Sequence, residues 1–244
     1  AESPQTGEGK VMGTTMDGFM VNVRGEKESW REVKVGCVFE IRPESTAKVN
    51  KSLETIPSIR ACEQAYVTHL GEPEPFVKKF IPLTQTKAWK QASETAVIGD
   101  GAVWIWNIAQ THFADSAHVV DWYHAKQHLW TAAHLIHPAD SAQAAIWVKQ
   151  QSDALYDGQA RTLAHTVSNF ADQLSGDPQK NLLTEAGYFD RNHERMQYHD
   201  FQLGGIPIGS GTVEAGAKQY KHRFTATGMR WSRQGLNNAL PFRD

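Results

Sequence analysis

The chain opens with two β-like runs and then alternates short strands with helices, and this order constrains the fold more than any other feature. Residues 11–24 and 31–41 are rich in β-branched and aromatic side chains, and the segment GEKES between them is typical of a turn, so they predict a β-hairpin. Short buried strands are predicted at 95–99 and 116–120, each followed by a helical pattern. This order predicts an α/β fold, with a mixed sheet and helices packed on it.

Helical patterning accounts for most of the remaining sequence. The segments 58–70 and 75–92 both predict helices, separated at GEPEP, where the prolines prevent continuation. Apolar residues recur at helical spacing in AVWIWNIAQTHF and again over 122–136. Near the end of the chain, TVEAGAKQYKHRF predicts a further helix that Ser210 or Thr212 can cap.

The chain has 244 residues, of which 40% are hydrophobic, and this is enough to bury a sizeable core. We expect it to divide into three consecutive segments. Residues 1–137 are the first part of the core, with the sheet and its flanking helices. Residues 138–203 carry mostly helix formers, with a loop at SGDPQ, and predict a helical insertion. Residues 204–244 return to the core with a closing helix and a basic C-terminal tail.

The sequence predicts neither a membrane span nor a signal peptide. No stretch approaches the roughly 18 uninterrupted apolar residues of a membrane span, and the start AESPQTGEGK lacks the apolar run of a signal peptide. We therefore expect a soluble, cytoplasmic protein, and, because the chain begins with Ala, removal or processing of something upstream. Cys37 and Cys62 lack the paired spacing of a zinc site or disulfide framework and are expected to be reduced, buried thiols.

Charge is distributed unevenly along the chain. The net charge of −2 is not that of a typical nucleic-acid-binding domain. The C-terminal tail, however, carries no acid between Glu214 and Asp244, and it predicts a phosphate-contacting surface, although a basic run is also the ordinary composition of a solvated face. The basic residues of this tail are Lys218, Lys221, Arg223, Arg230, Arg233 and Arg243.

Three acids occupy positions where a solvated charge is unexpected. Asp17 lies within the first apolar run, Asp100 directly follows the predicted strand 95–99, and Glu214 falls in the first turn of the closing helix. Each has an ordinary alternative, because Asp-Gly after a strand is often a turn and an early Glu favours the helix macrodipole. Together they are what a sheet needs to hold hard cations, and they predict a two-metal Mg²⁺ site, with Mn²⁺ as a substitute, for phosphodiester transfer.

Three phrases resemble a known family. VIGDGAVWIWN, VVDWYHAKQHL and IPIGSGTVEAGAKQYKHRFTATGMRWS are similar, in order and wording, to the DDE transposases of the Kra-type bacterial insertion sequences, relatives of the Mutator group. The resemblance covers nearly the whole chain and implies an RNase H-like fold with an α-helical insertion before the last catalytic acid. It matches Asp17 in MDGFMVNVRG, Asp100 in GDGAVWIW and Glu214 in GSGTVEA with the family's catalytic, metal-binding acids.

The resemblance also bears on several auxiliary residues. Asp121 and His124 in DWYH match a D-x-x-H signature of Mutator-like enzymes, which implies a role in DNA handling or active-site geometry. The alternatives are a helix cap by Asp121 and a hydrogen-bonded histidine. Arg230 and Trp231 in GMRWS are candidates for DNA contact near the active site, or for a surface loop packed on the sheet.

Two further patterns have a structural explanation that we favour. His124 and His128 are four residues apart, a spacing that can bind zinc, but the glutamate of H-E-x-x-H is missing. Trp side chains in the predicted helices could stack on bases, although their setting favours core packing. These tryptophans are Trp104, Trp106, Trp122 and Trp130.

The family likeness implies a DNA transposase domain that cleaves transposon-end DNA and joins the exposed 3′-hydroxyl to target DNA. Its DNA-binding residues would be Lys218, Lys221, Arg223, Arg230, Trp231 and Arg233. A homodimer or larger assembly on paired ends is expected, associated with the nucleoid when bound to DNA. Two alternatives stay open: a catalytically silent, domesticated DNA-binding relative, and a two-metal nuclease without strand transfer.

Overall fold

The chain forms two compact units in a computed structural model. The first comprises residues 1–117 and 210–244, and the second comprises residues 118–209. The structure describes residues 9–25, 29–44, 48–49, 55–87, 89–137, 141–209 and 220–243.

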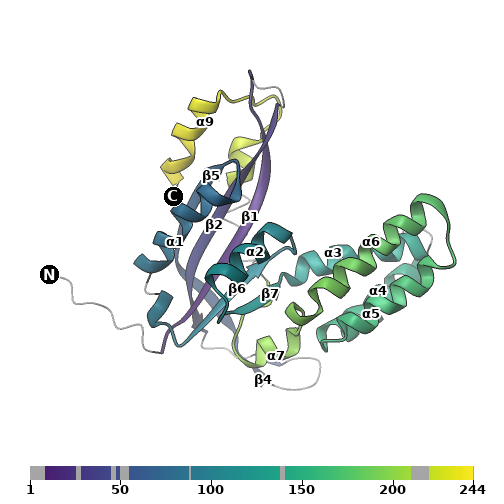
Figure 1. Cartoon of the computed structure of the whole chain (residues 1–244). Helices are drawn as coiled ribbons and strands as arrows, with labels where there is room; N and C mark the ends of the chain where they lie inside the picture. The colour runs from purple at the N-terminus through teal and green to yellow at the C-terminus, as the bar shows by residue number, and fades with distance from the viewer. Residues whose placement is uncertain are drawn as a thin grey trace. The chain divides into compact units, whose positions relative to one another are not determined.

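A five-stranded mixed sheet, in the order β5-β2-β1-β6-β7, confirms the predicted α/β class (Figure 1). β1 pairs antiparallel with β2, β2 pairs antiparallel with β5, and β6 runs parallel to β1. A separate two-stranded sheet is formed by β3 and β4. The strands are β1 Val11–Asn22, β2 Trp30–Pro43, β3 Lys48–Val49, β4 Thr55–Ile56, β5 Ile59–Leu70, β6 Glu94–Gly99 and β7 Ala117–Val120.

The predicted helix over 58–70 is wrong, because residues 59–70 form strand β5. The local sequence IRACEQAYVTHL contains several helix formers, which explains the prediction. Long-range pairing with β2 overrides this preference, as it commonly does for strands at the side of a sheet. A bulge near Val38 and Glu40 of β2 interrupts the pairing, and Glu63 takes a left-handed backbone with φ of 52°.

Helices α1 and α2 pack on one face of the sheet, which we call the α1 face. Gly36 of β2 allows this packing, since a Cβ at that position would lie 2.6 Å from the ring of Phe80. The ring of Phe76 stacks on Phe80 at 5.2 Å and meets Trp104 edge-on at 6.0 Å. Here α1 spans Pro73–Thr86, the 3-10 turn η1 spans Trp89–Gln91, and α2 spans Val103–His112.

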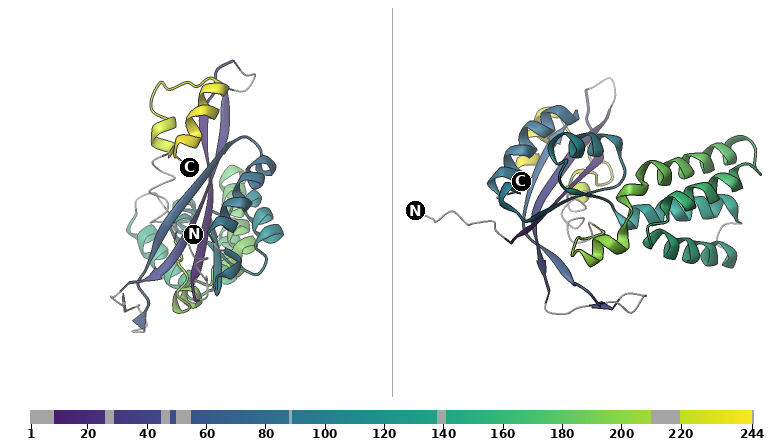
Figure 2. Two further views of the ribbon diagram at one scale, coloured as in Figure 1. Left: turned by 90° about the vertical axis from the view of Figure 1, so that its left-hand side faces the viewer. Right: turned by 60° about the horizontal axis from the view of Figure 1, so that its bottom comes forward.

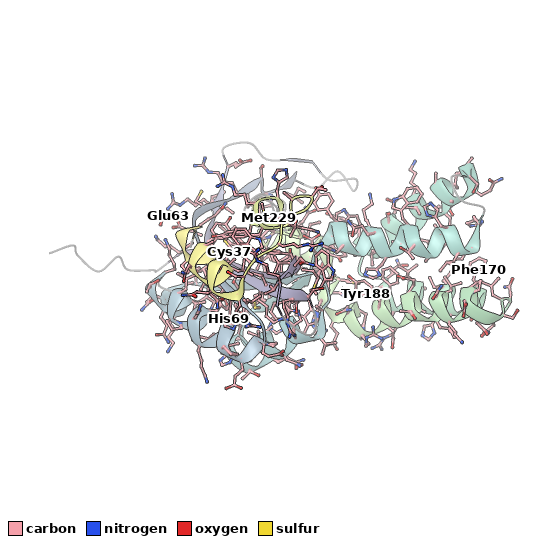
Figure 3. The ribbon with its side chains drawn as sticks, turned by 90° about the horizontal axis from the view of Figure 1, so that it is seen from above. Cys37, Glu63, His69, Phe170, Tyr188 and Met229 are labelled. Carbon is pink, nitrogen blue, oxygen red and sulfur yellow. The ribbon has the colours of Figure 1, made fainter. Side chains whose placement is uncertain are left out.

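The opposite face of the sheet, which we call the C-terminal face, packs against the end of the chain. Its core joins side chains of β1, β2 and β5 to the helical residues 220–224, to α9 (Arg233–Ala239) and to η3 (Leu240–Arg243). Figure 3 shows the two sides, with Cys37 toward the end of the chain and His69 toward α1. The buried members are Phe19, Val21, Val23, Val33, Val35, Leu70, Tyr220, Phe224, Leu236 and Leu240.

The second unit is helical, and Figure 2 shows its long helices lying side by side. Helix α3 packs on α4 and α6, and α5 packs on α6. This compact unit begins at residue 118, earlier than the insertion expected from 138, because α3 packs with the following helices. Its elements are α3 Trp122–Ile136, α4 Ala142–Tyr156, α5 Ala160–Ala171, α6 Gly176–Asn192, η2 His193–Arg195 and α7 Tyr198–Leu203.

Two further features of the helices bear on the sequence predictions. The loop expected at SGDPQ is wrong, because α6 already begins at Gly176 and accommodates Pro178 in its first turn, where proline is tolerated. Across the described ranges, the helices fall short of the length and apolarity that crossing a membrane requires.

Candidate active site

Asp17 lies in the middle of the sheet, on β1, and is half-buried. It pairs with Val35 of β2, and directly paired residues point to the same side of a sheet. Since Val35 belongs to the core of the C-terminal face, the Asp17 side chain lies on that face. One carboxylate oxygen, Oδ1, accepts a hydrogen bond of 2.6 Å from the backbone N–H of Gly18, which fixes the orientation of the group locally.

Asp100 is the residue that directly follows β6, and it is also half-buried. Its Oδ1 accepts a 2.8 Å hydrogen bond from the N–H of Ala102, the N-cap residue of α2. Gly101 between them has a φ of 105°, a conformation that glycine adopts without the steric cost of a Cβ. The carboxylate therefore lies just before a helix N-terminus, where the helix dipole favours negative charge.

The parallel pairing of β1 with β6 brings these two acids to equivalent positions. Every pair in this register joins a β1 residue to the residue 83 positions later, from Val11 with Glu94 to Thr15 with Ile98. The same offset relates Asp17 to Asp100, two residues beyond the last pair. Neighbouring strands lie about 4.8 Å apart, so the register points to adjacent carboxylates on the C-terminal face.

Gly99 allows the end of β6 to lie close to α2. A Cβ on Gly99 would approach Cγ2 of Ile105 to 2.9 Å and the ring of Trp106 to 3.5 Å. The end of β6 is therefore pressed against α2, on the α1 face. Alternation along β6 places Ile98, two residues before Asp100 and paired with Thr15, on the other side, the C-terminal face.

The third predicted acid, Glu214, lies outside the described residues, as does Lys218. Helical residues 220–224, which follow this segment, contribute Tyr220 and Phe224 to the core of the C-terminal face. Tyr220 also contacts Tyr66 of β5, with ring centroids 5.9 Å apart. The chain after Glu214 thus returns to the face on which Asp17 lies.

The acid pair has the chemistry of a site for hard cations. Carboxylate oxygens are the ligands that Mg²⁺ and Mn²⁺ prefer. Among the described residues no group of three or more histidine, cysteine or acidic side chains is arranged to hold a metal ion. The donor set of Asp17 and Asp100 fits such an ion in kind, and Glu214 would be the third donor.

Asp121 caps helix α3, which is the structural alternative considered for it. Its carboxylate is buried and accepts hydrogen bonds from the N–H groups of Tyr123, at 2.7 Å, and His124, at 3.1 Å. The same region holds the buried Tyr198, whose pKa is raised by burial, with Tyr188 and Asp121 adding to the effect. A role for Asp121 and His124 in DNA handling stays a prediction.

His128 forms a contact between helices and is not part of a metal group among the described residues. Its Nδ1 lies 2.7 Å from Oε2 of Glu185, which joins α3 to α6. The ring of Tyr188 stacks on the imidazole at a centroid distance of 3.6 Å. The four-residue spacing of His124 and His128 therefore has a packing explanation.

The tryptophans in the helices mostly pack. Trp106 is buried, Trp104 lies against Phe76 and the ammonium of Lys34, and Trp122 contacts Tyr198 at 4.8 Å. Trp130 is 37% exposed, so the packing prediction describes it less well.

The predicted DNA-binding residues of the tail divide into two groups. Lys221, Arg223, Arg230 and Arg233 are all exposed. Trp231 is partly buried, packs on Phe224 with centroids 5.3 Å apart, and donates its indole N–H to the carbonyl of Phe224. The structure therefore gives Trp231 a packing role on the C-terminal face, and its contact with DNA stays a prediction.

Residues at the end of the β1–β2 hairpin were missed by the sequence analysis. Trp30 is 57% exposed and Met20 48% exposed, and the exposed Arg24 lies close by in the chain. The available signal was a large aromatic residue next to a turn, where an unburied apolar side chain is unexpected.

Comparisons with protein-family models and with curated proteins gave no match for the chain.

Proposed function

We propose that the chain is the catalytic domain of a DDE-type DNA transposase, with Asp17, Asp100 and Glu214 as its acids. The observation that carries this proposal is the parallel register of β1 and β6, which relates Asp17 to Asp100 by a constant offset. Asp17 belongs to the face on which the chain after Glu214 packs, and the register points Asp100 toward the same face.

The topology agrees with an RNase H-like core. An antiparallel meander of β1, β2 and β5 is extended on the other side of β1 by the parallel strand β6. Such a core needs an acid on the first strand and another after the parallel strand beside it. The helical unit of residues 118–209 precedes Glu214, as the resemblance implies for the insertion.

Asp17, Asp100 and Glu214 would hold the magnesium ions of the proposed site. When bound, these ions would supply charge stabilisation to the attacking and leaving oxygens of a phosphodiester. The protein contributes fixed carboxylate positions, since the Gly18 and Ala102 N–H groups orient the two aspartates. Such orientation lowers the reorganisation needed when the substrate arrives.

The reaction that we propose has two phosphoryl transfers. In the first, water attacks the phosphorus at the transposon end, a P–O bond forms, and the bond to the 3′ oxygen breaks to leave a 3′-hydroxyl and a 5′-phosphate. In the second, that 3′-hydroxyl attacks a target phosphodiester and displaces the target's own 3′ oxygen. The protein forms no covalent bond in either step. We expect self-association on paired DNA ends.

Replacing Asp100 with Asn tests this proposal. We expect nicking of supercoiled DNA in Mg²⁺ to fall by ~10³-fold, because an amide removes a charge that the transition state requires, while DNA binding stays nearly intact. Asp17→Asn should behave in the same way. Glu94→Gln, an exposed acid at the other end of β6, is the matched control and should cleave normally.

Cleavage that survives Asp100→Asn at the wild-type rate would remove Asp100 from the mechanism. If the wild-type chain nicks DNA but never joins a supplied 3′-hydroxyl to a target, the nuclease alternative replaces the transposase. If it binds DNA without any cleavage, the silent DNA-binding alternative does.

A further inference from the structure

The loop of residues 226–232 is tied to the end of β1. The N–H of Trp231 donates to the carbonyl of Asn22 at 2.8 Å, and the N–H of Arg24 donates to the carbonyl of Trp231 at 2.9 Å. These bonds form a parallel bridge between Val23 and Trp231. This loop therefore lies beside the last residues of β1, beyond the part of β1 that pairs with β6.

The bridge joins this loop to the hairpin end at Val23, whose neighbour Asn22 pairs with Trp30 of β2 on the other side of β1. Directly paired residues point to the same side of a sheet, so Asn22 and Trp30 share one face, opposite to the buried Val23. Arg230 directly precedes the bridged Trp231, which packs on the core that contains Val23.

This face is uncovered at the hairpin end. Trp30 is 57% exposed and its diagonal neighbour Met20 is 48% exposed. Arg24 and Arg230 are exposed as well. An exposed tryptophan and two exposed arginines thus belong to segments that meet at the hairpin end.

The charge of this surface favours a polyanion. Residues 220–243 contain no acid, and the nearest acid of β2, Glu32, forms a 2.6 Å ion pair with the buried Lys34. The positive charge at the hairpin end comes from the exposed Arg24 and Arg230.

We propose that Trp30 stacks on an unpaired DNA base while Arg24 and Arg230 bind the flanking phosphates. This inference rests on the proposed function for the choice of DNA as the ligand. Stacking on an aromatic ring tolerates any base, and arginines beside it bind the backbone without sequence preference. The surface would therefore hold DNA whatever the end sequence.

Binding measurements with the full chain test this inference. The probe is a fluorescein-labelled duplex with an unpaired three-base stretch, followed by anisotropy over a range of salt concentrations. We expect Trp30→Ala to weaken binding about five-fold or more, and Trp30→Phe to restore most of the affinity. Arg24→Ala and Arg230→Ala should each reduce the slope of log K against log salt by about 1.

The controls are Trp130→Ala, an exposed tryptophan of α3, and Arg60→Ala, an exposed arginine at the far end of β5, and both should bind as the wild type does. If Trp30→Ala binds no worse than Trp130→Ala, or if the salt slopes of the two arginine variants are unchanged, the inference is overturned. These readouts measure DNA binding alone, so they are independent of the cleavage measured with Asp100→Asn. Loss of cleavage in Asp100→Asn together with unchanged DNA binding in Trp30→Ala would leave the proposed function standing and remove this surface.

Discussion

At the scale of single residues, the two aspartates of the proposed site are oriented by their own backbone neighbourhoods. Asp17 accepts from the next residue's N–H and Asp100 from the N–H two residues on. Such short loops of chain hold a carboxylate at little entropic cost, because few bonds are left to rotate. The geometry of each acid is therefore local, and only their proximity depends on the sheet.

Glu40 has a strongly lowered pKa, and this leads to a prediction about pH. The hydrogen bond from Arg42 is the main cause that lowers the pKa of Glu40 from 4.5 to about 2, with Lys10 adding to it against the opposing effect of burial. A lowered folded-state pKa stabilises the fold above about pH 4.5, and this contribution is lost as the pH falls toward 2.

Glu40→Gln should therefore lower the Tm at pH 7, and its difference from the wild type should shrink as the pH falls from 4.5 to 2. Thermal unfolding across this range measures the effect. Glu74→Gln is the control, because its ion pair with Lys78 lies in solvent, with 82% of the glutamate side chain exposed. A Glu40→Gln difference that stays constant with pH would contradict the assignment.

At the scale of elements, the turn between β6 and α2 determines where Asp100 lies. Gly101 has a φ of 105°, which a residue with a Cβ adopts only with strain. We expect Gly101→Ala to lower the free energy of unfolding by roughly 1–3 kcal/mol. Because the substitution would also move Asp100, we expect DNA cleavage to fall as well. Urea unfolding and plasmid nicking measure the two effects.

Gly204→Ala provides the comparison, because Gly204 has a φ of −74° and a Cβ there would meet only ordinary contacts at 3.5 Å. An unchanged stability in Gly101→Ala would mean that the turn relaxes without cost. Unchanged cleavage with reduced stability would separate the turn from the position of Asp100.

The elements also show what the sequence can predict. The hairpin, β6 and helix α3 follow from local patterns, because their apolar periodicity is set by burial within each element. Strand β5 was predicted as a helix because its residues suit either state and only pairing with β2 decides between them. The start of α6 at Gly176 was missed because its glycine and proline also favour a turn.

At the scale of the whole molecule, the proposed site depends on long-range pairing that no local pattern reveals. The sequence singled out Asp17 and Asp100 by their settings, but only the offset between β1 and β6 relates their positions in the sheet. Likewise, the surface of Trp30, Arg24 and Arg230 joins segments some 200 residues apart. Only Arg230 of that surface was predicted, because the basic tail is visible as composition, whereas an exposed tryptophan becomes evident only once burial is known.

The distribution of charge is likewise not evident from the total charge of the chain. The net charge of −2 conceals a C-terminal stretch that carries bases without acids. Local charge determines phosphate binding, since salt screens interactions beyond roughly 10 Å. A near-neutral chain can therefore bind DNA through one surface.

A crystal structure of the chain soaked in Mn²⁺, with the ions located by anomalous diffraction, tests the proposed active site most directly. Manganese takes the oxygen ligands that magnesium prefers and is readily identified. We predict anomalous density between the carboxylates of Asp17 and Asp100, with Glu214 as a further ligand. Density elsewhere only, or Glu214 remote from the two aspartates, would contradict the proposed site.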